Sequence, residues 1–505
     1  MKDRINILAI VFCLSVIFLA CSDDEGKTAG GVSVDEGLAT IDNVTIAGVS
    51  QKGPFVTNTS VQLFGLNKDF IQDGTSFNGK VFSEAGEFVM QRVSLSVPYA
   101  TLRINGYYHN EITGKISSSP VELRAVTDLS RRTAVNLNLL THLEYDRVFA
   151  LLDSDYTLAG AKKQSEREIF SAFFVNEKSE NFENLNIFEQ SSQNAALLGI
   201  SVLLQSTLSE GELTDLLAHI SSDVEADGVW DNDTLKAQIA DRAFGLDLTE
   251  VRKNIESWKF GDVSQFEPYV REFWRNVFGL PVCDTASEGK MVKVSNELSK
   301  YYGEFFVCHE KLWDSYTEIG YKMTLEEYSN LLLGQKGSGF DAWSYVKSGL
   351  VIKSNLGETG YWNITMEGNT TAVSESLVKD CGGICGTVIS KSGENGSYVG
   401  VTAVLGNAGG DVTEWLGVCV GYESDAEITV VVRDAASKGV NPDENWPRYT
   451  LPPVLKDTVV NVPWGLFSPR GSLKNVVGLE MIVRGDSESA PAFSITQLGA
   501  YGTCE

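Results

Sequence analysis

Aromatic and charged residues recur on one face of several short segments in the last third of the chain. In segments such as Tyr398 to Leu405 and Ile428 to Arg433, apolar residues alternate with other types, so one face packs into a core and the other meets solvent or ligand. An aromatic ring can stack on the apolar C–H face of a sugar, and charged groups can bond its hydroxyls. The candidate sugar-binding residues are Tyr398, Trp415, Arg433, Trp446, Tyr449 and Glu480.

The segment from Trp415 to Tyr422 has a second face that could form the floor of a groove. Its alternation places Leu416, Val418, Val420 and Tyr422 in the core and Trp415, Gly417, Cys419 and Gly421 on the opposite face. A disulfide from Cys419 to Cys504 would occupy the middle of that face. We therefore expect the groove at one end of the domain, near Trp415 and Tyr398.

The cysteines suggest a disulfide-bonded, exported chain. Apart from Cys13 and Cys21 near the N-terminus, six cysteines remain, an even number that is typical of three disulfides, although many pairings are possible. The pairs that we favour are Cys283–Cys308, Cys381–Cys385 and Cys419–Cys504. A zinc site is the alternative, but no Cys-x-x-Cys pairs or histidine partners accompany these cysteines.

One stretch has carboxylates with the spacing of a calcium-binding loop, namely Asp223, Glu225, Asp227 and Asp231. Hard oxygen ligands at alternate positions suit Ca²⁺, but Thr234 stands where a standard loop has a bidentate Glu. The alternative is a connection between helices in which Asp231, Asn232 or Asp233 caps the second helix. No other cofactor is expected.

Composition and motifs exclude several functions. The chain has 505 residues and a formal net charge of −26, which argues against nucleic acid because phosphates are bound by Lys and Arg. The acidity is compatible with a neutral polysaccharide. We find no Gly-x-Ser-x-Gly, His-Glu-x-x-His or phosphate-binding loop, so an enzyme is not expected. A cryptic glycoside hydrolase remains an alternative and would need two carboxylates about 5–10 Å apart in an open cleft.

The N-terminus is a targeting segment. An apolar run from Ile7 to Ala20 follows a short basic stretch and is too short to span a bilayer as a helix. Its end, Phe18-Leu19-Ala20-Cys21, resembles the lipobox of bacterial lipoproteins, with Phe where Leu is usual. The resemblance implies that residues 1–20 are a signal peptide, that Cys21 carries the acyl chains of a membrane anchor, and that residues 21–40 are an acidic tether reaching the exterior of the outer membrane.

Two domains are expected before the cysteine-rich part. Short alternating segments in residues 41–128 predict a small β-sandwich. The sequences Gly48 to Phe55, Val61-x-Leu63 and Gly86-x-Phe88 resemble the transthyretin-like, carboxypeptidase-regulatory type of Ig-like domain, which is mainly a spacer. In residues 129–280, apolar residues recur every three or four positions, which predicts an all-α bundle of seven helices.

The residues after 280 predict a small unit followed by a larger β domain. Together with the β and helical domains before them, they give a multi-domain α+β fold class. Residues 281–316 form a core too small to be stable without a disulfide, and residues 317–338 are a linker with a short helix. Residues 339–505 contain nine short strands, as in a two-sheet jelly roll.

Three sequences in this last domain resemble carbohydrate-binding modules with the galactose-binding-like jelly roll. They are Gly417-Val418-Cys419-Val420-x-Tyr422-x-Ser424, Val462-Pro463-Trp464-x-x-Phe467 and Phe493-x-Ile495-x-x-Leu498-Gly499. Such modules occur on cellulases and surface lipoproteins of cellulose-degrading bacteria. The resemblance implies binding of cellulose or another plant glucan. The rival hypothesis is a structural lipoprotein that contacts other surface proteins and binds no sugar.

Overall fold

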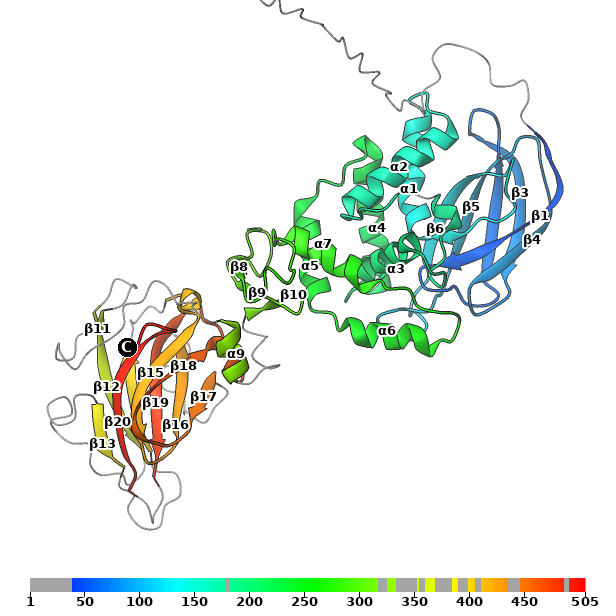
Figure 1. Cartoon of the computed structure of the whole chain (residues 1–505). Helices are drawn as coiled ribbons and strands as arrows, with labels where there is room; N and C mark the ends of the chain where they lie inside the picture. The colour runs from blue at the N-terminus through cyan, green and yellow to red at the C-terminus, as the bar shows by residue number, and fades with distance from the viewer. Residues whose placement is uncertain are drawn as a thin grey trace, which may run out of the picture. The chain divides into compact units, whose positions relative to one another are not determined.

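The computed structural model describes residues 39–178, 181–316, 325–332, 352–353, 359–367, 384–388, 398–404, 410–434, 446–485 and 490–504. Cys21 and Cys381 lie outside the described residues, so the lipidation of the first and the disulfide of the second stay predictions. The chain divides into two compact units, Met1–Trp274 and Arg275–Glu505 (Figure 1). We call them the N-terminal unit and the C-terminal unit.

The N-terminal unit contains a seven-stranded sheet with the order β6-β5-β2-β3-β4-β1-β7. Its strands alternate between faces, as in β2, where Val61 and Leu63 are buried and Gln62 is exposed. All seven strands join one hydrogen-bonded sheet, so the likeness to an Ig-like sandwich stays a prediction. The strands are β1 (Ile41–Gln51), β2 (Ser60–Leu66), β3 (Gln72–Val81), β4 (Glu87–Leu95), β5 (Tyr99–Gly106), β6 (Val121–Asp128) and β7 (Leu137–Asn138).

Seven α-helices follow in the described part of the chain up to Val277, and they match the seven expected from the apolar spacing. Asn138 is the N-cap residue of α1 and Ser209 that of α4. Each forms a capping box, which satisfies backbone N–H groups in the first turn of its helix. The helices are α1 (Leu139–Leu152), α2 (Leu158–Ala172), α3 (Ser192–Gln205), α4 (Glu210–Asp227), α5 (Asp233–Phe244), α6 (Leu248–Ser257) and α7 (Glu267–Val277).

The sheet and the helices of the N-terminal unit share a core. Val126 of β6 packs with Val148 of α1 and Ala161 of α2. The boundary expected at residue 128 therefore separates two kinds of element but not two hydrophobic cores. Within the described residues, no helix has the length and apolar character needed to cross a bilayer.

The C-terminal unit begins with a three-stranded sheet of order β10-β9-β8. Its strands are β8 (Met291–Lys293), β9 (Phe305–His309) and β10 (Leu312–Ser315). The Cys283–Cys308 disulfide fixes β9 to the preceding segment, in the pairing that we favoured. A short helix, α9 (Leu325–Leu331), lies where the linker was expected.

The rest of the C-terminal unit is a β-sandwich of two sheets (Figure 1). One sheet has the order β11-β12-β14-β19-β16-β17 and the other β13-β20-β15-β18. The strands are β11 (Ile352–Lys353), β12 (Thr359–Glu367), β13 (Ile384–Thr387), β14 (Tyr398–Val404), β15 (Gly417–Ser424), β16 (Ile428–Asp434), β17 (Arg448–Leu451), β18 (Val454–Pro463), β19 (Val476–Arg484) and β20 (Ala492–Ala500).

One hydrophobic core extends from the sandwich into the three-stranded sheet. It includes Val401 and Val430 from the six-stranded sheet, Val418 from the four-stranded sheet, and Val307 and Tyr316 beside them. Tyr316 also donates its hydroxyl to the carbonyl oxygen of Leu416. The small cysteine-closed unit is therefore part of the same body as the sandwich.

Candidate functional site

The six-stranded sheet has one face in the sandwich core and an outer face of different composition. Val401, Val430 and Leu479 face the core, as the alternation predicted. In the antiparallel register Glu480 lies opposite both Thr402 and Val431, and residues in register share a face. The outer face therefore carries side chains of β14, β19 and β16 that are absent from the core: Tyr398, Thr402, Val431, Arg433, Glu480, Ile482 and Arg484.

The aromatic part of this outer face is a small cluster around Tyr398. The ring packs with Val431 and Ile482, and Trp446 covers them from the segment before β17. Only 3% of Tyr398 is exposed, whereas Trp446 is half-buried. The indole Nε1 of Trp446 is buried and has no hydrogen-bond partner among the residues that the structure describes.

The charged part of the outer face is the ion pair between Arg433 and Glu480. Arg433 donates from Nε to Glu480 Oε2 at 2.7 Å. The side chains are 13% and 3% exposed, so solvent screens this pair less than a pair on the open surface. A guanidinium that is held by its partner still has N–H groups for a ligand oxygen.

Four of the six expected sugar-binding residues therefore come together: Tyr398, Arg433, Trp446 and Glu480. Tyr398 and Glu480 are almost fully buried, so a ligand would meet Trp446 and Arg433 first. Tyr398 packs against Trp446 and Glu480 bonds Arg433, so these two buried side chains would hold the two contact residues in place. An aromatic side chain beside a fixed hydrogen-bonding group can hold the apolar face and the hydroxyls of a sugar together.

The expectation for Trp415 is wrong, because its side chain is 0% exposed and lies in the sandwich core. The extended chain begins at Gly417 rather than at Trp415, which ends the 3-10 helix Thr413–Trp415. Leu416 has a left-handed φ of 62°. The turn at Leu416 interrupts the alternation, so Trp415 does not keep the outward direction that its spacing from Gly417 implied.

Tyr449 does not lie on the outer face with the other four residues. Tyr449 pairs with Val430, a core residue, and its ring packs against the core with its centre 6.2 Å from that of Phe467. The next residue pair, Arg448 with Val431, lies on the outer face. Arg448 is thus the residue of β17 that sequence reasoning missed, and the register of β17 against β16 is the signal that would have found it.

The outer face of β15 is closed and forms no groove floor. Cys419 is bonded to Cys504, and the backbone N–H of Gly502 donates to Asn461 Oδ1 at 2.7 Å. A Cβ built on Gly421 would lie 2.7 Å from Thr496 Oγ1. The C-terminal segment therefore covers this face, and Trp415, in the 3-10 helix before β15, does not share a face with Tyr398 of β14.

The carboxylates with calcium-like spacing do not form a loop. Asp223, Glu225 and Asp227 lie in the last turns of α4, where successive residues point about 100° apart. Asp223 Oδ2 accepts from the backbone N–H of Asp231 at 3.1 Å, and Asn232 caps α5. No group of three metal-ligating side chains occurs among the residues that the structure describes.

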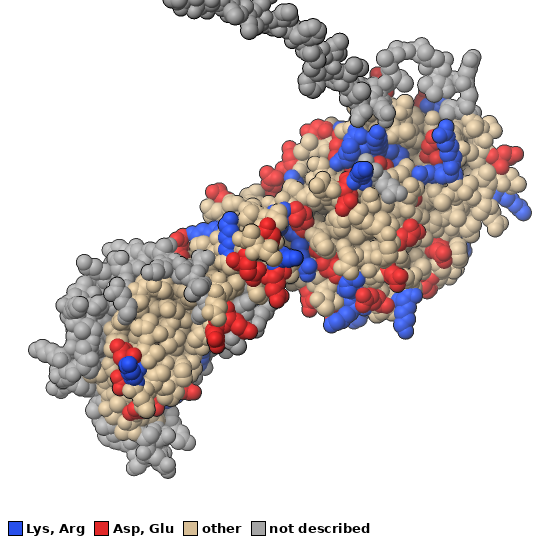
Figure 2. Space-filling view, in the orientation of Figure 1, with Lys and Arg blue, Asp and Glu red and all other residues tan. Residues whose placement is uncertain are grey.

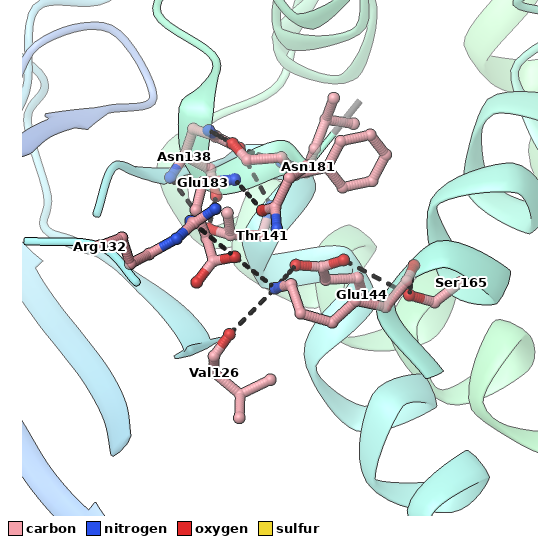
Figure 3. Close-up of polar contacts among 11 residues, drawn as sticks. Val126, Arg132, Asn138, Thr141, Glu144, Ser165, Asn181 and Glu183 are labelled. Atoms are coloured by element: carbon pink, nitrogen blue, oxygen red, sulfur yellow. Dashed lines mark hydrogen bonds and ion pairs between the residues drawn. The ribbon is translucent and has the colours of Figure 1, made fainter. Parts of the chain in front are cut away.

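The hydrolase hypothesis directs attention to the carboxylates around Lys162 in the N-terminal unit (Figure 3). Lys162 Nζ bonds Glu144 Oε1 at 2.6 Å, Glu183 Oε2 at 3.0 Å and the carbonyl oxygen of Val126 at 2.9 Å. Arg132 pairs with Glu183 at 3.1 Å. The cluster connects β6, α1, α2 and the 3-10 helix Phe182–Asn184.

Glu144 and Glu183 are buried and form ion pairs with Lys162 and Arg132. The side chains of Glu144 and Glu183 are 0% and 1% exposed. Burial raises the pKa of Glu144, and burial followed by repulsion from Glu144 raises the pKa of Glu166. A cavity of about 500 Å³ touches Glu166 and Glu183, but Glu183 is already paired with Lys162 and Arg132. The arrangement suits a structural role, in which the ion pairs hold β6, α1, α2 and the 3-10 helix together.

Comparison with known proteins finds no matching family and no relative among curated proteins. Among solved structures, a family 11 carbohydrate-binding module from Clostridium thermocellum in complex with a beta-1,3-1,4-mixed-linked tetrasaccharide is similar at 15% identity. The similarity covers 34% of this chain and 94% of that one, with a TM-score of 0.20. A family 30 carbohydrate-binding module shows 12% identity over 28% of this chain and 76% of its own, with a TM-score of 0.19. A family 29 module, CBM29-2, shows 11% identity over 28% and 81%, with a TM-score of 0.18.

Proposed function

We propose that the chain is a non-catalytic lipoprotein of the bacterial outer membrane that binds a neutral polysaccharide, cellulose or another plant glucan, through its C-terminal sandwich. The lipobox-like sequence ending in Cys21 and the acidic residues after it support the anchor and the exterior location. The binding proposal concerns the outer face of the six-stranded sheet alone.

The observation that carries the proposal is the placement of Trp446 beside the Arg433–Glu480 ion pair. Trp446 packs over Val431, and Arg433 lies two residues along the same strand on the same face. A sugar ring that stacks on the indole would bring its hydroxyls toward the guanidinium.

The ion pair at the centre of this site is compatible with a neutral ligand. Arg433 and Glu480 compensate each other, so a ligand needs no net charge to bind beside them. On the face in view, the described surface of the sandwich carries few Lys, Arg, Asp or Glu side chains (Figure 2). The net charge of −26 would also repel an acidic polymer.

Affinity electrophoresis of residues 22–505 tests the proposal. Native gels containing hydroxyethylcellulose, mixed-linkage β-glucan or xylan should retard the wild-type chain. Trp446→Ala and Arg433→Met should each weaken retardation by about fivefold or more, since either loses one of the two contact types. Tyr107→Ala is the matched control, because Tyr107 is an exposed aromatic residue (46%) of the N-terminal unit.

The outcomes separate the two hypotheses. A wild-type chain that migrates equally in all gels would reject polysaccharide binding and favour the protein-binding lipoprotein. Retardation that Tyr107→Ala reduces as much as Trp446→Ala does would place binding elsewhere. The melting temperature of Trp446→Ala must stay close to that of the wild type, so that lost retardation reports binding and not unfolding. Arg433→Met leaves the buried Glu480 unpaired, so its retardation is compared with that of Arg433→Met/Glu480→Met, in which neither charge remains.

A further inference from the structure

The C-terminal unit holds a cavity of about 380 Å³ where the three-stranded sheet meets the sandwich. This volume lies in the range of roughly 300–1,000 Å³ that is usual for small-ligand sites. Tyr301, Phe305 and Tyr316 line it from one side. Trp464, Phe467 and residues 470–474 line it from the other. None of the four outer-face residues proposed to support glucan binding lines this cavity.

Two of the aromatic residues that line the cavity have their polar atoms already bonded. Trp464 donates from Nε1 to the carbonyl oxygen of Val412 at 3.1 Å, and the Tyr316 hydroxyl bonds Leu416. Phe305 and Phe467 have no polar side-chain atoms. A sugar placed between these rings would set hydroxyls against apolar surface, which costs free energy. The interior therefore suits an apolar, flat group that can pack against aromatic rings.

The charged residues that line the cavity have an excess of positive charge. Arg470 and Lys474 are exposed, and Glu304 is the half-exposed carboxylate among the lining residues. Lys474 makes no ion pair with any part of the chain that the structure describes. In a chain of net charge −26, two cations against one carboxylate at a small cavity mark a place where an anion is favoured.

The loop that carries these cations is held in place before any ligand binds. Ser468 and Arg448 exchange backbone hydrogen bonds at 3.1 and 3.0 Å, and the backbone N–H of Val412 donates to the carbonyl oxygen of Leu473 at 2.8 Å. A Cβ on Gly471 would lie 2.4 Å from Pro447 Cγ, so the loop packs closely there. A fixed loop lowers the entropy cost of binding.

We propose that this cavity binds a small planar aromatic carboxylate. The ring enters between Phe305 and the Trp464–Phe467 pair, and the carboxylate stays at the mouth, where Arg470 and Lys474 provide charge-assisted hydrogen bonds. The site is independent of the outer face of the six-stranded sheet, so it stands even if that face binds no glucan.

Calorimetric titration of residues 22–505 with trans-cinnamate tests the proposal. Cinnamyl alcohol has the same ring and no charge, and it should bind about fivefold or more weakly because it lacks the charge-assisted contacts. Cellobiose should give no binding that depends on Phe305. Added salt should weaken the binding of cinnamate and leave that of the alcohol unchanged.

Variants locate the site. The double variant Arg470→Met/Lys474→Met should bind cinnamate about fivefold to twentyfold more weakly and make the two probes equal. Lys456→Met is the matched control, because Lys456 is exposed on β18 and lies outside the cavity lining. Phe305→Leu should weaken both probes, whereas Trp446→Ala should leave cinnamate binding unchanged while it weakens glucan retardation.

Three results would overturn the proposal: no cinnamate binding at millimolar concentration, equal affinity of the wild type for cinnamate and cinnamyl alcohol, or an unchanged affinity in the Arg470/Lys474 double variant. The cationic residues are exposed, so their replacement should not unfold the chain, and the melting temperature checks this. Loss of glucan retardation with intact cinnamate binding would reject the outer-face site alone.

Discussion

The carboxylate of Glu480 lies against the bare backbone of Gly400 on the neighbouring strand. A Cβ built on Gly400 would lie 2.4 Å from Glu480 Oε1, which is closer than real atoms approach. On its other side Glu480 accepts from Arg433 Nε at 2.7 Å. The missing side chain at position 400 therefore gives the carboxylate the room it needs to lie across the sheet and bond Arg433.

This relationship predicts that Gly400→Ala destabilises the C-terminal unit through Glu480. The new methyl group must push the carboxylate aside, which weakens a buried ion pair, so the free energy of unfolding should fall by about 1–3 kcal/mol. Denaturation in urea measures the loss. In a Glu480→Ala background the same substitution should cost almost nothing, because the clashing oxygen is gone. Equal costs in both backgrounds would show that Glu480 is not the cause.

The two tryptophans Trp415 and Trp446 should separate stability from binding. Trp415 is fully buried in the sandwich core, so Trp415→Ala should lower the free energy of unfolding by about 3–5 kcal/mol. Trp446 is half-buried on the outer face, so Trp446→Ala should lower the free energy of unfolding by less than Trp415→Ala does and should reduce glucan retardation by more. Urea denaturation and affinity electrophoresis of the two variants test this. A larger binding loss for Trp415→Phe, a milder core change, than for Trp446→Phe would contradict the assignment.

The alternation of residues along β14, β16 and β19 was sufficient to predict which side chains face the core. Val430 and Leu479 lie inside, and Arg433 and Glu480 lie outside, because each strand keeps a period of two over its length. The seven helices were equally predictable from apolar spacing. In both cases the pattern is local and uninterrupted, so long-range contacts reinforce it.

The remaining features depend on information that no local pattern contains. The direction of Trp415 depends on the left-handed turn at Leu416, and that of Tyr449 depends on its register with Val430. The cavity beside Phe305 depends on how the three-stranded sheet packs on the sandwich. That packing involves Tyr316 and Leu416, which are far apart in the sequence. These contacts are set by tertiary structure.

The two described disulfides should differ in how much they stabilise the C-terminal unit. Cys419–Cys504 closes a separation of 85 residues and Cys283–Cys308 one of 25. Because a longer loop loses more entropy in the unfolded chain, Cys419→Ala/Cys504→Ala should cost about 1 kcal/mol more than Cys283→Ala/Cys308→Ala, on a loss of about 2–4 kcal/mol each. Urea denaturation of both double variants measures the difference. The reverse order would show that native packing around the bonds outweighs loop entropy.

The cluster around Lys162 should make the stability of the N-terminal unit depend on pH through Glu166. Burial and the neighbouring Glu144 raise the pKa of Glu166 to about 8. Its folded-state pKa then exceeds that of the unfolded chain, so the folded state binds the proton more tightly. The stabilisation is complete below the ordinary glutamate pKa and is lost as the pH rises through about 8.

Replacing Glu166 by Gln removes this titration and keeps a side-chain oxygen to accept the backbone hydrogen bond from Phe182. Between pH 5 and pH 8, the wild type should therefore lose about 1–3 kcal/mol more stability than Glu166→Gln. Thermal and urea unfolding at the two pH values measure the difference. His142 has a pKa lowered to about 3 by burial and acts in the opposite sense, because its stabilisation is lost as the pH falls below its ordinary value. Both proteins contain His142, so its contribution is the same in each and drops out of the difference. Parallel curves of stability against pH for the wild type and Glu166→Gln would refute the role of Glu166.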